Sequence, residues 1–129
     1  MLRPTGVWLH ARVLWELVRY DLRFACRGLR GVCVRESHDA SSPAQGSVEV
    51  ESAVCEALAS LAPFYWKPIR CLQRSMVTAR LMRRSGVAAE VVIGYRAAPF
   101  FSHAWVEVAG RVVNDSPSFQ RRLHVLERL

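Results

Sequence analysis

The 129-residue chain has a single lysine, no CxxC cysteine pair and no long uncharged apolar run. A membrane span needs about 20 apolar residues, so we expect none. The first 20 residues mix His, Arg and Glu with apolar residues, which argues against a secretory signal and predicts a cytoplasmic protein. The four cysteines lack metal-ligand spacing and the histidines are scattered. We therefore expect no zinc framework and no cofactor.

The charge is strongly positive, at +7, and almost all of the cations are arginines. A basic chain is compatible with nucleic acid, an acidic peptide or an anionic surface as its partner. However, the arginines are spread along the whole chain, and no dense basic run or RNA-binding motif is present. We therefore expect no nucleic-acid partner, although a non-catalytic basic binding or scaffold module stays open as an alternative function.

Length and pattern predict one α+β domain over residues 1–129. Apolar residues recur at helical spacing over residues 8–30, 48–61 and 71–84, and strand-like alternation runs from residue 89 to 96 and on through two further short strands. This order predicts N-terminal helices, then a nucleophile helix packed on a small antiparallel β-meander. Residues 118–129 have helix-like polarity.

Within this domain, residues 1–50 are predicted to form a helical N-terminal part, and residues 51–129 the catalytic core. Residues 36–47 are polar, small and contain Pro and Gly, which is typical of an internal loop. In the first helix, Leu14 and Leu17 are expected on the buried side. Glu16 and Arg19 are expected on the solvent side.

The stretch FFSHAWVEVAGRVVNDSP, residues 100–117, predicts a β-hairpin whose register depends on the length of its turn. A two-residue turn at Ala109 and Gly110 pairs Val108 with Arg111. A three-residue loop pairs Glu107 with Arg111 instead, and leaves the glycine where a left-handed conformation is wanted.

The choice of register decides whether His103 and Asp115 meet. The shorter turn points the two side chains to opposite faces, whereas the longer loop places them directly opposite one another. The longer loop also creates an opposite-charge pair and an aromatic–valine pair, each worth about 0.2–1 kcal/mol. We therefore predict the three-residue loop and a His103–Asp115 cross-strand pair, which without a nucleophile is no more than a surface polar contact.

Cys71 is the candidate nucleophile. Pro68 makes continued helix upstream unfavourable, so Cys71 is expected in the first turn of the third helix. The positive end of the helix dipole and the adjacent Arg70 stabilise a thiolate there. Free N–H groups of this turn, including that of Cys71, are suited to hold an oxyanion. Tyr65, Trp66 and Gln73 are near enough to be second donors or simply structural.

The other cysteines have no such surroundings. Cys26 and Cys55 lie inside amphipathic helices, and Cys33 follows one. We expect each of them to be a small buried hydrophobic residue. A carboxylate that orients a histidine is useful when the other ring nitrogen activates a thiol. The residues alone thus support a hypothesis of a Cys71–His103–Asp115 triad.

The segments CLQRS, LMRRSGVAAEVVIGY and FFSHAWVEVAGRVVND resemble those of the transglutaminase-like cysteine peptidases that mature lasso peptides. In particular, they are similar to the stand-alone leader-peptidase subunit of a split maturation protease. The resemblance runs from about Val54 to Pro117. Ser102 stands where Ala often precedes the histidine, which is a tolerable change.

The resemblance implies a transglutaminase-like, papain-like core with Cys71 as nucleophile, His103 as general base and Asp115 as the residue that orients it. It implies a precursor peptide as substrate, cleaved between leader and core through an acyl-enzyme. A separate leader-recognition protein and a lasso cyclase are the implied partners. Because this fold hosts hydrolases and transferases alike, acyl or amide transfer stays an alternative.

Overall fold

The computed structural model describes residues 7–28, 47–115 and 118–129. The helices are α1 (Val7–Arg27), α3 (Ser47–Leu61), the short 3₁₀ helix η1 (Ala62–Phe64), α4 (Cys71–Arg84) and α5 (Ser118–Arg122). The strands are β1 (Ala89–Ala97), β2 (Phe100–Val108), β3 (Arg111–Val112) and β4 (His124–Arg128). The arrangement is α+β, as predicted. The loop predicted over residues 36–47 falls outside the described residues, apart from Ser47, which begins α3.

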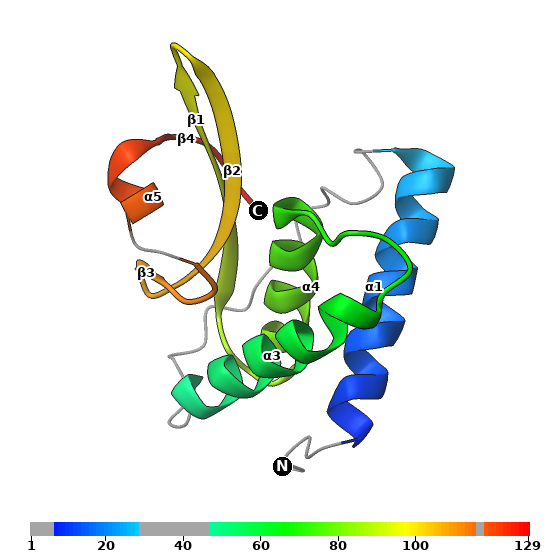
Figure 1. Cartoon of the computed structure of the whole chain (residues 1–129). Coiled ribbons are helices and arrows are strands. Elements are labelled where there is room, and N and C mark those ends of the chain that lie inside the picture. The colour runs from blue at the N-terminus through cyan, green and yellow to red at the C-terminus, as the bar shows by residue number, and fades with distance from the viewer. Residues whose placement is uncertain (1–6, 29–46, 116–117) are drawn as a thin grey trace.

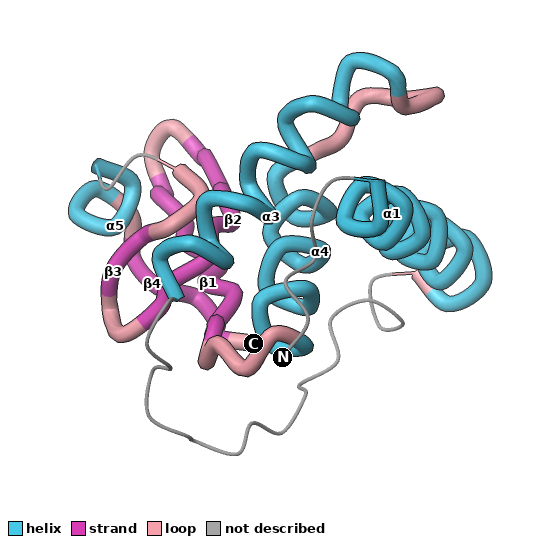
Figure 2. Tube along the Cα trace, turned by 90° about the horizontal axis from the view of Figure 1, so that it is seen from below, coloured by secondary structure: helices cyan, strands magenta, loops and turns pink. Residues whose placement is uncertain are grey.

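The helices and the sheet form successive layers, with α4 in the middle (Figures 1 and 2). One side of α4 packs on β1 and β2, and other sides contact α1 and α3. Buried apolar side chains from all of these elements form the main core; they include Val13, Leu17, Val54, Leu58, Met82, Val91 and Val106. The position of α4 relative to the sheet is therefore set by packing on several sides.

Glycines directly follow the ends of two helices. Gly28 follows α1 with a φ of 62°, and its N–H donates to the Phe24 carbonyl. After α4, Gly86 has a φ of 87° and donates to Arg83. The next N–H, that of Val87, bonds back to the Met82 carbonyl, which completes a Schellman motif. The predicted bounds of the nucleophile helix, 71–84, are confirmed.

The orientation of α1 differs from the prediction. Leu17 is buried as expected, but Glu16 is only 3% exposed and Leu14 is 45% exposed. The reason is an ion pair: the Glu16 carboxylate lies 2.8 Å from Nε of Arg80 on α4. A paired carboxylate can be buried between two helices. The charge of Glu16 therefore led to the wrong prediction that this residue faces solvent. Trp15, at 60% exposed, lies on the outer face instead.

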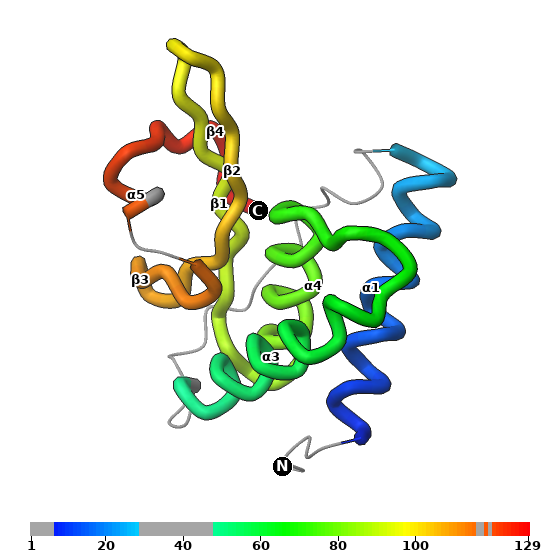
Figure 3. The backbone as a smooth tube through the Cα atoms, in the orientation of Figure 1, coloured from blue at the N-terminus to red at the C-terminus, as the bar shows by residue number. Residues whose placement is uncertain are grey.

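The sheet has four antiparallel strands in the order β3-β2-β1-β4 (Figure 3). The last strand is a correction, because the polarity of residues 118–129 indicated helix. Only Ser118–Arg122 is helical, and β4 pairs with the free edge of β1. All five side chains of β4 are exposed, so backbone hydrogen bonding and not apolar alternation defines this strand.

The predicted hairpin register is wrong. The structure pairs Val108 with Arg111 across a two-residue turn, in which Ala109 and Gly110 have φ values of 52° and 77°. Positive φ at both positions is a type I′ turn, whose twist matches the flanking strands. The expected partner of Arg111, Glu107, is buried and accepts a hydrogen bond from the Trp105 indole instead.

Arg111 is also engaged elsewhere. Its guanidinium makes two hydrogen bonds of 3.1 Å to the two carboxylate oxygens of Glu51 on α3. These bonds raise the pKa of Arg111. Arg111 therefore pairs with Glu51 on α3 and not with Glu107, the partner that favoured the longer loop. The sequence of the hairpin contains no signal for this distant partner.

Candidate active site

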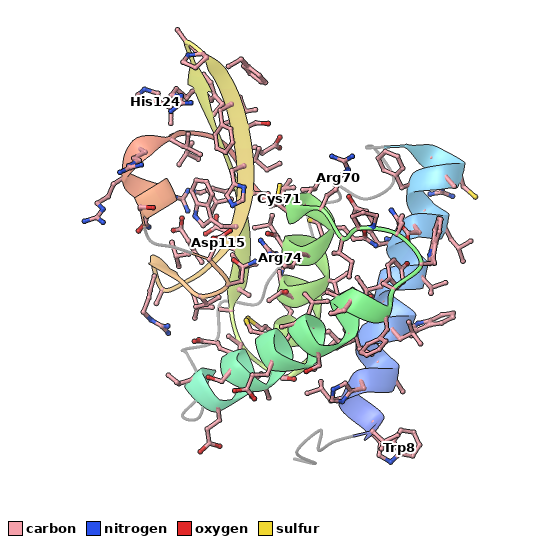
Figure 4. The ribbon with its side chains drawn as sticks, viewed as in Figure 1. Trp8, Arg70, Cys71, Arg74, Asp115 and His124 are labelled. Carbon is pink, nitrogen blue, oxygen red and sulfur yellow. The ribbon has the colours of Figure 1, made fainter. Side chains whose placement is uncertain are left out.

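Cys71 is the first residue of α4 and is a free, half-buried thiol. Arg70 precedes the helix in an extended conformation, and its carbonyl accepts the first intrahelical bond, from Arg74 N–H at 2.9 Å. Figure 4 shows Cys71 and Arg74 on α4, and Asp115 close to the strand that faces this helix. The predicted position of Cys71, at the positive end of a helix, is confirmed.

His103 and Asp115 are in direct contact. The distance from His103 Nε2 to Asp115 Oδ2 is 2.6 Å, and the two side chains are 14% and 18% exposed. His103 lies on β2, opposite Gly94 of β1. Phe101 and Trp105, two residues to either side, stack near its imidazole ring. These neighbours restrict the orientation of the ring, and Nδ1 is the nitrogen on its other side.

The contact arises because β3 stops early. Regular continuation of the observed register would set Asp115 opposite Ala104, facing away from His103. Instead, the ladder ends with the bond from Val113 N–H to the Val106 carbonyl, at 3.0 Å. The Val106 N–H then donates to the side-chain oxygen of Asn114, at 2.8 Å, and not to a strand carbonyl. The chain leaves the sheet at this point, and Asp115 turns toward His103.

Asn114 also anchors this segment to the nucleophile helix. Its Nδ2 donates to the hydroxyl of Ser75, which is fully buried on α4. The Asn114 side chain thus ends the β3 ladder and also ties this end of the ladder to α4. Sequence reasoning did not identify this role; the only signal was an amide residue directly before the candidate carboxylate.

Arg74 is a second residue that sequence reasoning missed. Its Nη2 lies 3.3 Å from the same Asp115 oxygen that contacts His103. Arg74 is three residues after Cys71, so both face the same side of α4. The signal was present in CLQRS, where an arginine follows the cysteine by nearly one turn. The carboxylate of Asp115 therefore joins the histidine strand to the nucleophile helix.

The three side chains considered as second oxyanion donors have other positions. The Tyr65 hydroxyl donates to Asp21 on α1. Burial is the main cause, and this hydrogen bond the second, that raises the pKa of Tyr65 to about 12. Gln73 is buried and donates to the Leu17 carbonyl, also on α1. Trp66 is largely exposed. Tyr65 and Gln73 thus join α1 to the segment around Cys71.

The remaining cysteines differ from Cys71. Cys55 is half-buried, its thiol donates to the Val113 carbonyl at 3.7 Å, and burial raises its pKa. Cys26 is exposed on α1, which corrects the expectation that it is buried. Cys33 lies outside the described residues. Among the cysteines that the structure describes, Cys71 alone begins a helix.

The described residues form neither a metal-binding cluster nor a membrane-spanning helix. In the part of the chain that the structure describes, no group of three or more His, Cys, Asp or Glu side chains is placed to hold a metal ion. Nor is any described helix both long enough and apolar enough to cross a bilayer.

The fold and the Cys71, His103 and Asp115 positions define a class of protein. The family described as the Transglutaminase-like superfamily matches residues 16–128, which is most of the chain. The chain therefore belongs to the transglutaminase-like superfamily.

One relative is more specific. The chain is 41% identical over 59 residues to the microcin J25-processing protein McjB of Escherichia coli. This stretch covers 46% of the chain and only 28% of that relative's length. The resemblance to lasso-peptide processing proteins is thereby confirmed over this part of the chain. No solved structure matches the chain significantly.

Proposed function

We propose that this protein is a cysteine peptidase that removes the leader from a lasso-peptide precursor. The observation that carries the proposal is the His103–Asp115 pair, linked through Arg74 to the helix that begins at Cys71. A thiol at a helix N-terminus and an imidazole that is oriented by a carboxylate are the groups that nucleophilic acyl chemistry needs. The similarity to McjB, which by its name processes microcin J25, supports the choice of substrate.

In the first half-reaction, His103 Nδ1 takes the proton of the Cys71 thiol, because Nε2 is held by Asp115. The sulfur attacks the carbonyl carbon of the scissile peptide bond and forms a C–S bond. The negative oxygen of the tetrahedral intermediate is held by the N–H of Cys71 in the first turn of α4. His103 then donates its proton to the leaving nitrogen, the C–N bond breaks, and the core peptide leaves with a free amine.

In the second half-reaction, water replaces the departed amine. His103 Nδ1 takes a proton from this water while its oxygen attacks the thioester carbon. The C–S bond breaks, the imidazolium returns its proton to the Cys71 sulfur, and the leader leaves with a new carboxyl group. Asp115 stabilises the imidazolium in both halves without taking the proton itself.

The partners proposed are the precursor peptide, a separate leader-recognition protein and the lasso cyclase. The outer face of α1 supports the second of these. Val7, Trp8, Leu14, Trp15 and Leu22 are all strongly exposed, which is unusual for side chains of this size. We propose that this surface, called the α1 outer face below, binds the leader-recognition protein.

The experiment is cleavage of a precursor peptide by the purified chain together with its leader-recognition protein, followed by mass spectrometry. Cys71→Ala and His103→Ala are expected to be inactive. Asp115→Asn is expected to slow turnover by about 10²–10⁴, since the imidazole loses its charged orienting partner. Cys26→Ser is the matched control, because Cys26 is an exposed thiol on a different helix.

Circular dichroism of each variant verifies that the fold is kept. Full cleavage by Cys71→Ala would refute the peptidase mechanism. A product in which the leader carries an added amine instead of a new carboxyl group would identify the chain as an acyl transferase that uses the same triad.

A further inference from the structure

The α1 outer face carries a regular row of apolar side chains. Its two tryptophans and Leu22 recur every seven residues, and smaller apolar residues lie between them. Six positions of α1, all exposed or half-buried and spaced alternately by three and four residues, form this apolar row: Trp8, Ala11, Trp15, Val18, Leu22 and Ala25. The row covers about 25 Å of helix at 1.5 Å per residue.

The opposite side of α1 is already occupied by the body of the protein. Val13 and Leu17 are completely buried and belong to the main core. In Figure 2 the helix lies along one side of the molecule, and Figure 4 shows Trp8 pointing away from α3 and α4. A surface helix normally has polar residues on its outer side. A second apolar row on the solvent side therefore marks a contact surface.

The spacing of the apolar row indicates the shape of what binds there. An α-helix has 3.6 residues per turn, so positions seven apart drift by only about 20° and stay on one line along the helix. Alternating spacings of three and four residues are the pattern with which one helix packs lengthwise on another, each side chain entering a hole between four residues of the partner. The complementary element is therefore a helix that runs along α1.

One border of the apolar row is basic. Arg12, Arg19 and Arg23 follow one another along it, and Arg12 and Arg23 are exposed without a carboxylate partner among the described residues. Arg19 lies 3.5 Å from Glu16, but the same carboxylate oxygen is 2.8 Å from Arg80. Burial, followed by the nearby guanidinium groups of Arg80 and Arg23, lowers the pKa of Arg19. This border thus has an excess of positive charge.

The excess charge distinguishes between possible occupants. The two acidic residues of α1 are both engaged inside the protein, Glu16 with Arg80 and Asp21 with Lys67. A second copy of the chain would bring the same arginines and no available carboxylate. A helix that lies on an anionic membrane normally carries Lys and Arg over its polar face. Here Asp21 lies at the other border of the row, so acidic side chains of a partner protein fit this surface best.

We infer that the α1 outer face binds one amphipathic helix of the leader-recognition protein, with apolar residues spaced by three and four and acidic residues facing Arg12, Arg19 and Arg23. The inference deepens the proposed function and rests on it. The tryptophans supply large apolar contacts, which dominate the affinity of such interfaces. The arginines select an acidic helix over a basic one and fix its orientation.

The test begins with two synthetic probes that isolate the border charge. Both are helical peptides of the length of α1 with leucine at the same alternating spacing, and they differ only in the residues that border the leucines, which are Glu in one and Lys in the other. Calorimetry with the wild-type chain at low ionic strength gives each Kd. The Glu peptide should bind about tenfold more tightly than the Lys peptide. High salt should reduce this difference, because it screens exposed charges.

Substitutions in the chain locate the peptides on α1. In the double variant Arg12→Glu, Arg23→Glu the preference should reverse, so that the Lys peptide binds more tightly. The matched control, Arg121→Glu with Arg122→Glu, changes two exposed arginines of α5 and should keep the preference for the Glu peptide. Ala11→Glu places a charge in the middle of the apolar row and should weaken both peptides. Circular dichroism verifies that each variant keeps its fold.

The leader-recognition protein itself is then titrated against the same variants. Ala11→Glu and the Arg12, Arg23 double variant should each weaken its binding about tenfold, and the α5 control should not. Three results overturn the inference: unchanged binding of the recognition protein in both variants, equal affinity for the two peptides, or a preference for Glu that the charge reversal leaves intact.

Other occupants would have signatures of their own. Self-association of the wild-type chain in analytical ultracentrifugation that Ala11→Glu abolishes would assign the face to a second copy. Sedimentation with phosphatidylglycerol vesicles that Ala11→Glu prevents would assign it to a membrane. The proposed function is measured separately, as precursor cleavage by the wild-type chain. An active peptidase whose recognition protein ignores this face rejects the docking surface alone, whereas docking without cleavage rejects the peptidase alone.

Discussion

Asp115 Oδ2 receives contacts from two elements, His103 on β2 and Arg74 on α4. A carboxylate with only one partner can rotate away from it. The guanidinium of Arg74 on its other side holds the Asp115 carboxylate in its direction toward the imidazole. We therefore propose that Arg74 is a positioning residue that acts on His103 through Asp115.

Removing this guanidinium should reduce catalysis without unfolding the protein. Arg74→Ala is expected to lower kcat for precursor cleavage about tenfold, which corresponds to loss of one charge-assisted hydrogen bond. Steady-state kinetics separate this effect on kcat from any effect on KM. Arg84→Gln, an exposed residue at the end of the same helix, is the control and should be neutral. An unchanged kcat in Arg74→Ala would remove Arg74 from the site.

At the scale of elements, the β2–β3 hairpin determines where the segment that carries Asp115 leaves the sheet. Its turn places Ala109 at a φ of 52°, a left-handed conformation that disfavours residues with a Cβ. Asn and Gly are the usual residues of a type I′ turn, and Gly110 already occupies the second position. The turn thus has the type I′ geometry that suits a hairpin, but Ala109 is an unfavourable residue at its first position.

Ala109→Asn should therefore stabilise the protein by about 0.5–1 kcal/mol, because asparagine tolerates this conformation better than alanine. Urea denaturation measures the change. Gly110→Ala is the opposite test. Nothing lies within 4 Å of the added Cβ, so its expected cost of about 1 kcal/mol is conformational only. A less stable Ala109→Asn variant would contradict the observed register.

At the scale of the whole molecule, α1 has two different faces. The inner face binds the body of the protein through Leu17, Glu16 and the Glu16–Arg80 ion pair. It also lies against the segment before α4, where Asp21 pairs with Lys67 at 2.6 Å. The outer face carries exposed tryptophans, and its apolar side chains have no role in this packing. This outer face is the surface proposed above to bind the leader-recognition protein.

Substitution on the α1 outer face should thus affect delivery of the substrate and not the chemistry. Trp15→Ser is expected to weaken binding of the leader-recognition protein by about tenfold or more, since aromatic anchors dominate such interfaces. Calorimetry measures this binding, and thermal unfolding should show little change. Phe100→Ser, an exposed aromatic at the β1–β2 turn, is the matched control. Equal binding by Trp15→Ser would place the partner on another surface.

Local patterns predicted the helices well, because periodicity and glycine positions act over a few residues. Cys71 falls at the start of α4, as expected. The errors concern long-range partners. Glu16 was assigned to solvent because Arg80, 64 residues away, is not visible in the local pattern. Strand β4 was missed because its pairing with β1 is made by the backbone.

The His103–Asp115 contact shows, within one site, the same difference between local patterns and long-range partners. Residue patterns were enough to predict that a cysteine begins a helix, that a histidine lies on a strand and that a carboxylate follows the next strand. The contact was expected from a register that the protein does not adopt. The contact forms through packing between distant elements, since Asn114 ends the ladder and bonds to Ser75 on α4. Residue type and periodicity are local properties, whereas the direction in which a chain leaves a sheet depends on what packs against it.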